Sequence, residues 1–274
     1  MATAPPDIKQ RHRAMWASGD YPHIAHIVAP VSEHMVRAAG VAAGQRVLDI
    51  AAGTGSSAIP AAQTGAEVVA SDLTPELFPE GQQRAEELGL SIEWVEADAE
   101  NLPFGDAEFD VVMSAIGAMF APIHEAVARE MLRVCRPGGT IAMANWTPEG
   151  LIGQMFKVMG PYAPPPPPGA TPPPLWGSEE HVREMFGDGL SDLRMERHVL
   201  SVTELKTPDE YVDMFKEKYG PTLAVQKNIG DDPERQAEFD RAYREFARNA
   251  NSGSDDAARF DQEYLIVVGT RAGG

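Results

Sequence analysis

A carboxylate and two glycines stand close together near residue 50, in an arrangement that can hold a ligand. Asp49 comes four residues before Gly53, and Gly55 follows two residues later. Glycine has no Cβ, so the backbone at these positions can turn sharply and approach a bound molecule closely. A helix that begins behind such a turn directs free backbone N–H groups at the same space. The segment therefore predicts a binding site in which a carboxylate and bare backbone face one ligand.

Two kinds of ligand fit this turn. Residues 53–58 formally match the G-x-G-x-x-G/A pattern of dinucleotide-binding folds, in which a helix N-terminus holds a pyrophosphate. The carboxylate of Asp49, however, would repel a pyrophosphate, whereas it suits a ligand that carries an ammonium and a sulfonium group. The residues thus favour the second ligand and leave an NAD(P)-dependent oxidoreductase as the alternative.

The segment 46–58 resembles the first motif of the class I S-adenosylmethionine (SAM)-dependent methyltransferases. Four later segments match the same family in the same order. The resemblance is nearest to small-molecule methyltransferases of the ubiquinone/menaquinone-biosynthesis type. The matching segments are an apolar strand over 67–72, a strand over 92–97 that leads into Asp98, a strand over 109–115, and a helix, Pro-Gly-Gly turn and strand over 132–145.

The resemblance implies SAM as the cofactor and a role for each residue that matches a family motif. Asp49 would order the glycine turn and interact with the ammonium of SAM. Asp72 would hold the ribose hydroxyls, as an acidic residue at this spacing does in nucleotide folds generally, and Asp98 would bind the adenine edge. The expected cofactor-binding residues are Asp49, Ala51, Gly53, Gly55, Asp72, Leu73, Asp98, Ala99, Ser114 and Ile116, with Trp16 and Tyr21 assigned to an N-terminal lid.

Methyl transfer needs little from catalytic side chains beyond positioning the nucleophile and excluding water. A general base assists where the acceptor is a phenol, an amine or an enol. His124, which follows the strand over 109–115, is the candidate base, and a helix-terminal residue without a catalytic part is the alternative. His23 and His26 in the N-terminal helices are further options between which the sequence does not choose. The histidines and the one cysteine show no metal-ligand spacing, so no metal is expected.

Strands and helices alternate along the chain, which predicts a parallel sheet. Helices are expected over 57–64, 75–89 and 123–135, a sixth strand over 193–205 and a last strand over 263–270. With the resemblance, this predicts an α/β, Rossmann-like, seven-stranded and mostly parallel sheet whose last strand is antiparallel. Helices cover both faces, and an N-terminal helical lid and a helical insertion are added to this core.

A single domain over 1–274 is expected, because a chain of this length can bury one α/β core. It divides into an N-terminal helical cap (1–45), a SAM-binding core (46–146), a proline-rich lid segment (147–193) and C-terminal strands and helices (194–274). The prolines between 161 and 174 exclude a helix and favour stiff polyproline II. They can form one wall of a substrate lid, a plain surface connector or a docking motif for a partner domain.

The composition narrows the partners. The chain has 41 acidic and 23 basic residues and a formal charge of −18, which repels phosphate backbones and argues against a nucleic acid partner. It has no apolar run of about 18 residues to span a membrane. Its N-terminus shows no secretory signal, and its single cysteine, Cys135, fits a reducing cytoplasm.

Together these observations predict a cytoplasmic methyltransferase that acts on a small, fairly apolar acceptor. A non-catalytic SAM-binding protein with the same fold stays open as an alternative, because function belongs to the site and not to the fold. The sequence does not identify the acceptor, the atom that is methylated or the oligomeric state.

Overall fold

Residues 3–273 are described by the computed structural model, in which seven strands form one sheet. The strand order is β3-β2-β1-β4-β5-β7-β6, and β7 runs antiparallel to both of its neighbours. This confirms the expected mostly parallel sheet with an antiparallel last strand. The strands are β1 (Arg46–Ile50), β2 (Glu67–Asp72), β3 (Ile92–Glu96), β4 (Phe109–Ala115), β5 (Cys135–Trp146), β6 (Leu190–Val202) and β7 (Phe260–Arg271).

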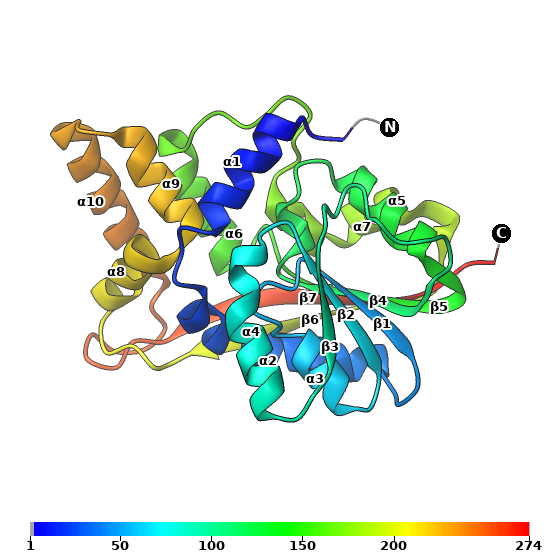
Figure 1. Ribbon diagram of the computed structural model, residues 1–274. Coiled ribbons are helices and arrows are strands. Elements are labelled where there is room, and N and C mark those ends of the chain that lie inside the picture. Colours follow the sequence, from blue (N-terminus) through cyan, green and yellow to red (C-terminus); the bar gives the residue numbers. More distant parts are fainter. Residues whose placement is uncertain (1–2, 274) are drawn as a thin grey trace.

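Helices cover both faces of the sheet (Figure 1). In that view α2 and α3 lie on one side of the strands and α5 and α7 on the other, while α1 lies beside α9 at one end. The helices are α1 (Pro6–Trp16), α2 (Tyr21–Ala39), α3 (Ala58–Gln63), α4 (Phe78–Glu87), α5 (His124–Val134), α6 (Leu151–Met159), α7 (Glu179–Phe186), α8 (Pro208–Lys218), α9 (Gly220–Ile229) and α10 (Pro233–Ala250).

The central strands are apolar because they are covered on both faces. Val47 and Leu48 of β1 and Val111 and Val112 of β4 are fully buried, as expected for parallel strands with helices on either side. Charged and polar residues stand mostly at the strand ends and in the turns that follow them. The buried strands thus bring these turns together at the carboxyl edge of the sheet, where open α/β sheets bind ligands.

Several element boundaries differ from the sequence prediction. β6 occupies 190–202 and not 193–205. The helical region over 208–249 is three helices, because breaks at Tyr219 and at Gly230 interrupt it. The Pro-Gly-Gly turn lies inside β5, where the pairing with β4 shifts between Phe109 and Val111 and Gly138 has a φ of 73°.

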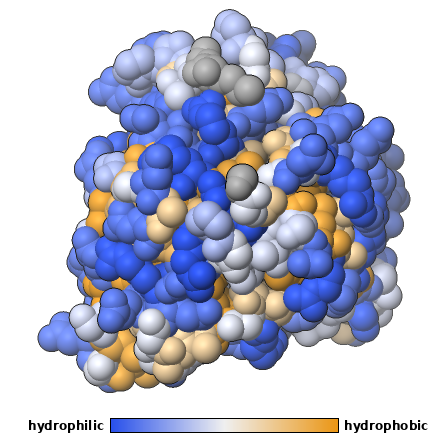
Figure 2. All heavy atoms as spheres, turned by 90° about the vertical axis from the view of Figure 1, so that its right-hand side faces the viewer, coloured by the Kyte–Doolittle hydropathy of each residue, from blue (hydrophilic) through white to orange (hydrophobic). Residues whose placement is uncertain are grey.

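Hydrophilic residues cover most of the face shown in Figure 2, and apolar residues show between them in smaller areas. This agrees with the large excess of acidic residues in the sequence. Within residues 3–273 no helix has the length and apolar character needed to cross a membrane.

Candidate active site

The turn after β1 presents bare backbone at the carboxyl edge of the sheet. Its backbone is left-handed at Ala51 (φ 55°), Gly53 (φ 54°) and Gly55 (φ 81°). A Cβ on Gly55 would lie 2.7 Å from the ring of Trp94, so this glycine is needed for packing inside the protein. A Cβ on Gly53 would have no protein atom nearer than Leu77 Cδ1 at 3.9 Å. Gly53 therefore leaves open space on its side of the turn, and this space is a cavity.

The side chain of Asp49 lies in this region and does not have a full set of hydrogen bonds. The residue is 1% exposed, and among residues 3–273 no group hydrogen-bonds to its Oδ2. Burial raises the pKa of this carboxyl well above its ordinary value, and the negative charge of Asp72 raises it further, whereas the backbone N–H of Ala58 lowers it. A buried carboxylate oxygen of this kind costs free energy unless a cation or a donor reaches it.

Asp72 at the end of β2 holds the glycine turn in place. Its Oδ2 accepts a hydrogen bond from the backbone N–H of Gly53 at 2.8 Å, and its Oδ1 accepts one from the N–H of Thr74 at 2.7 Å. Burial raises the pKa of Asp72, and these two N–H groups oppose that shift. Carboxylate oxygens can accept more than one hydrogen bond, so Asp72 can support the turn and still bind a hydroxyl.

Two adjoining cavities lie along this edge of the sheet. Both are bordered by the glycine turn and by the same aromatic side chains of the N-terminal segment. The residues that border both are Trp16, Tyr21, Ala51, Gly53, Leu77, Ile116 and Phe120. The first cavity continues to Asp49, Thr54, Ser57, Trp146, Ile152, Met214, Phe215, Tyr219 and Gln262, and the second continues to Lys9, His12, Asp72, Leu73, Asp98, Ala99, Glu100 and Pro122.

Helix α1 covers the second cavity and is tied to it by charge. Lys9 forms ion pairs with Asp98 and, at 3.0 Å, with Glu100, whose side chain is fully buried. Glu100 also accepts hydrogen bonds from the backbone N–H groups of Ala4 at 2.6 Å and Ile123 at 2.9 Å. A few residues along the helix, Arg13 pairs with Glu76 and Glu96. Two basic residues thus hold α1 against the acidic turns that follow β2 and β3.

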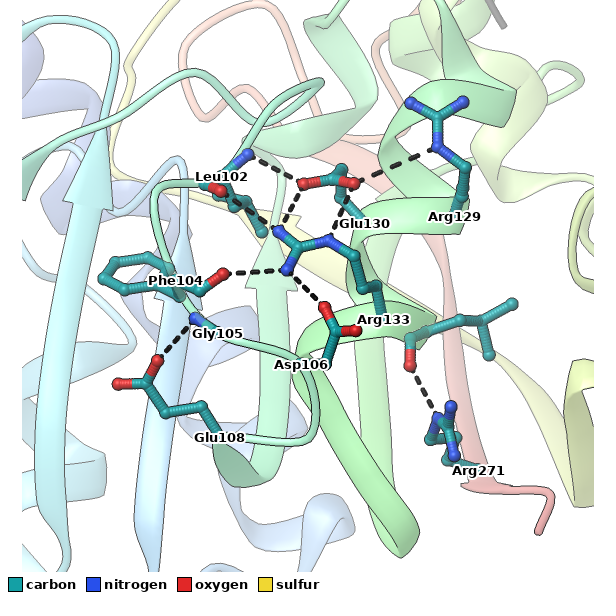
Figure 3. Close-up of polar contacts among 10 residues, drawn as sticks. Leu102, Phe104, Gly105, Asp106, Glu108, Arg129, Glu130, Arg133 and Arg271 are labelled. Atoms are coloured by element: carbon teal, nitrogen blue, oxygen red, sulfur yellow. Dashed lines mark hydrogen bonds and ion pairs between the residues drawn. The ribbon is translucent and has the colours of Figure 1, made fainter. Parts of the chain in front are cut away.

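Figure 3 shows how side chains of α5 hold the loop that follows Asp98. Arg133 on α5 donates to the carbonyl oxygens of Leu102 (3.0 Å) and Phe104 (2.8 Å) and pairs with Asp106 (2.9 Å). Glu130, one turn earlier on α5, pairs with Arg133 and accepts from the N–H of Leu102. These contacts set the position of the loop that carries the wall of the second cavity.

The chain is similar to known proteins over different parts of its length. A family model described as a methyltransferase domain matches residues 47–139. The uncharacterized protein Rv1405c of Mycobacterium tuberculosis is 46% identical over 258 residues, which cover 94% of this chain and 93% of that protein. The demethylmenaquinone methyltransferase of Beutenbergia cavernae is 40% identical over 122 residues, or 42% of this chain and 49% of that enzyme.

Among solved structures, the YcgJ protein of Bacillus subtilis shares the fold, with a TM-score of 0.62 and 18% identity over 89% of this chain and 99% of that one. The chain belongs to the class I SAM-dependent methyltransferases. This decides between the two ligands left open by the glycine turn: the cofactor of this methyltransferase is SAM.

The methyltransferase brings most of the expected cofactor residues to the two cavities. Trp16, Tyr21, Ala51, Gly53 and Ile116 border both, Asp49 borders the first, and Asp72, Leu73, Asp98 and Ala99 border the second. Gly55 and Ser114 are not among the bordering residues. The hydroxyl of Ser114 donates to the carbonyl oxygen of Ile50 (2.7 Å) and accepts from the N–H of Ala118 (3.0 Å). Its position therefore favours a supporting role behind the site.

His124 lies away from both cavities, which does not support the general-base interpretation. Its side chain is fully buried, and its Nδ1 lies 3.0 Å from Nε2 of His181. Burial lowers the pKa of His124 to about 3, with the neighbouring His181 as the second cause. The ring also packs near Trp176, at 5.4 Å between ring centroids. The imidazole of His124 is not among the groups that border either cavity. His23 and His26 also lie outside both cavities.

The prolines over 161–174 also lie outside the two cavities. Of the segment 147–193, only Ile152 borders the first cavity. The proline run is instead fixed to its surroundings, since Thr171 donates to the carbonyl oxygen of Pro122 at 3.0 Å and the buried Trp176 packs near His124. The expected stiff wall of a substrate lid is therefore not formed by these prolines, and the segment connects α6 to α7.

Sequence reasoning missed the far end of the first cavity and the polar cover of the second. The missed residues are Lys9, His12, Thr54, Ser57, Trp146, Met214, Phe215, Tyr219 and Gln262. Thr54 and Ser57 stand inside the glycine motif and could have been included from their position. The others come from α1, the last residue of β5, α8 and the residue after it, and β7, whose sequences give no local sign that they meet at the edge of the sheet.

Proposed function

We propose that this methyltransferase transfers the methyl group of SAM to a small, uncharged and largely apolar acceptor that enters the first cavity. The observation that carries the proposal is the Oδ2 of Asp49, a buried carboxylate oxygen that has no hydrogen-bond partner among residues 3–273 and lies at the edge of a cavity with mainly apolar walls. A cationic methyl donor would satisfy this oxygen, and the apolar walls beyond it suit an acceptor without charge.

The residues around the two cavities fit SAM. Asp49 would bind the ammonium group, and the backbone of Ala51 and Gly53 would lie along the methionine part. Asp72 would accept from the ribose, while Asp98 and Ala99 would bind the adenine. Trp16 and Tyr21, whose rings lie 5.5 Å apart, would close the site toward solvent from the N-terminal side. Bound SAM supplies an electrophilic methyl group on its sulfonium.

The walls of the first cavity favour a neutral acceptor. The described residues that border it include aromatic side chains from four parts of the chain, namely Trp16, Phe120, Trp146 and Phe215. No Lys, Arg or His is among them. A carboxylate or phosphate on the acceptor would therefore lose its hydration without gaining a side chain of opposite charge, which costs several kcal/mol or more.

The same walls offer no ordinary general base. The titratable groups that border the first cavity are Asp49, Tyr21 and Tyr219. Burial raises the pKa of both tyrosines, so they stay protonated at neutral pH and act as hydrogen-bond groups. We therefore assign to the protein the positioning of the acceptor and the exclusion of water, and to the acceptor the loss of its own proton.

A screen of small molecules with methyl-labelled SAM tests this proposal. Acceptors are offered in pairs that differ by one charge, such as an aromatic alcohol or amine and the matching carboxylic acid derivative. We expect methylation of neutral members and at least tenfold lower kcat/KM for their anionic partners, because no cationic side chain is among the described residues that border the cavity. Preferred methylation of the anionic members would contradict the assignment of the acceptor class.

A further inference from the structure

One buried polar side chain at the far end of the first cavity has no role in the binding of SAM described above. Gln262 on β7 borders this cavity and is only 2% exposed. Its Nε2 donates to the hydroxyl of Tyr211 at 3.2 Å. Among residues 3–273 no group hydrogen-bonds to its Oε1, so one end of the amide is fixed and the other is left to the cavity.

The fixed end gives the amide a defined direction. Tyr211 is itself fully buried, and its ring stacks on Phe260 with 3.9 Å between the centroids. Phe215 lies on the same helix, α8, and borders the first cavity, and its ring centroid is 4.8 Å from that of Tyr211. The phenol therefore sits in a rigid aromatic cluster, and the amide that it holds is positioned in advance of any ligand.

A second polar group without a described partner borders the same cavity. Ser32 on α2 is 2% exposed, and no hydrogen bond to its hydroxyl is present within residues 3–273. A hydroxyl both donates and accepts, whereas a carboxamide oxygen only accepts. Both residues border the same cavity, so a ligand that enters it can supply hydrogen-bond partners to both groups.

This polar end is distant from the groups assigned to SAM. The glycine turn follows β1, while Gln262 lies on β7, three strands away in the order β1-β4-β5-β7. Neighbouring strands are about 4.7–4.9 Å apart, which gives a separation of about 14 Å across the edge of the sheet. Gln262 thus belongs to the acceptor side of the cavity.

We propose that Gln262, oriented by Tyr211, is a specificity-determining residue that accepts a hydrogen bond from a neutral hydroxyl or N–H group on a flat, otherwise apolar acceptor. The inference rests on the proposed function and deepens it by naming the group that the acceptor must carry. The aromatic walls bind the flat apolar body of such a molecule, and Gln262 selects members of this class that have a donor over those that lack one.

Binding of three probes to the protein saturated with S-adenosylhomocysteine tests the proposal by isothermal titration calorimetry. The probes are 2-naphthol, which has a hydroxyl donor, 2-methoxynaphthalene, which lacks it, and 2-naphthoate, which is charged. We expect 2-naphthol to bind about three- to tenfold more tightly than 2-methoxynaphthalene, as one net hydrogen bond allows, and 2-naphthoate to bind most weakly. Equal binding of the first two probes, or no binding of 2-naphthol at millimolar concentration, would overturn the proposal.

Two variants separate recognition from a structural effect. Gln262→Leu keeps the approximate shape and removes the acceptor oxygen, so the preference for 2-naphthol should disappear. Tyr211→Phe loses the same buried hydrogen bond but keeps the amide. The folded protein should lose stability, as with Gln262→Leu, but some preference for 2-naphthol should remain. The double variant leaves no unpaired hydroxyl and serves if Gln262→Leu does not fold. A preference that persists in the folded Gln262→Leu or double variant would overturn the assignment.

The same titrations keep this inference distinct from the proposed function. Wild-type protein that fails to bind S-adenosylhomocysteine would contradict the SAM site itself. Normal binding of S-adenosylhomocysteine together with no preference between the naphthalene probes would contradict only the role of Gln262.

Discussion

At the scale of single residues, Asp49 shows how a binding site opposes the stability of the protein that carries it. Its carboxyl is buried, one oxygen has no hydrogen-bond partner in the described part of the chain, and burial raises its pKa well above 3.8. The folded chain therefore holds the proton of Asp49 more tightly than the unfolded chain does. Its contribution to the free energy of unfolding is fully present below pH 3.8 and is lost as the pH rises through the higher pKa of the folded state.

Asp49→Asn should therefore stabilise the ligand-free protein at neutral pH while it weakens SAM binding. Each unit of pKa shift corresponds to about 1.4 kcal/mol, and 1 kcal/mol changes the Tm of a chain of this size by about 2–4 °C. Loss of a hydrogen bond to a charged group should reduce the affinity for SAM about 10- to 100-fold. Calorimetry without and with SAM measures both effects.

The exposed Asp231 provides the control, because Asp231→Asn removes one negative charge from the surface and should change neither quantity. The gain in Tm should also shrink as the pH approaches 4. An Asp49→Asn variant that binds SAM with wild-type affinity would contradict the role of this carboxylate.

At the scale of secondary-structure elements, the N-terminal helix α1 covers the second cavity and would have to open for SAM to leave by that side. SAM in the second cavity would lie beneath α1, which Lys9 and Arg13 hold to the acidic turns after β2 and β3. The side chain of Lys9 is only 15% exposed, whereas that of Arg13 is 35% exposed. Lys9 is therefore less screened by solvent and salt, and it is the stronger of the two ties.

Lys9→Met removes this tie and keeps the apolar stem of the side chain. We expect SAM to dissociate about fivefold faster, which corresponds to roughly 1 kcal/mol for a partly buried ion pair. Stopped-flow fluorescence can follow the release, since Trp16 borders both cavities. Added salt should accelerate release from the wild type more than from the variant. Lys206→Met, on an exposed residue, is the control, and equal release rates for Lys9→Met and wild type would show that α1 does not retain SAM.

Local sequence patterns picked out most of the residues proposed to bind the cofactor, which border the two cavities, and not those at the far end of the first cavity. Asp49, Gly53, Asp72 and Asp98 stand at the ends of strands that pair in parallel, so the fold alone brings them to one edge. Gln262 reaches that edge only because β7 inserts between β5 and β6. A position next to a strand end also does not give the direction of a side chain, and this is why His124 was expected in the site and is instead enclosed by Trp176 and His181.

At the scale of the whole molecule, the net charge and the sheet topology affect different aspects of ligand recognition. The formal charge of −18 argues against a nucleic acid substrate, and the carboxyl edge of the sheet gathers acidic side chains that suit a cationic cofactor. The residues from β5 onward that border the first cavity are mostly apolar, which fits the acceptor that we propose. The cytoplasmic location stays a prediction.

The central claim is that the bare backbone at Gly53 lies against SAM, and a pair of glycine variants tests it. Gly53 and Gly40 both have left-handed backbones, with φ values of 54° and 67°, and a Cβ on either would meet no protein atom closer than 3.9 Å. Alanine therefore costs about 1–2 kcal/mol of backbone strain at each position. Only Gly53 borders the cavities.

The decisive measurement is the dissociation constant for SAM of Gly53→Ala and Gly40→Ala, determined by isothermal titration calorimetry. We predict a similar loss of Tm in both variants, an affinity within about twofold of wild type for Gly40→Ala, and an affinity at least tenfold weaker for Gly53→Ala, since the added methyl group enters the space of the ligand. Equal affinities for SAM in the two variants, or wild-type protein that does not bind SAM, would contradict the account.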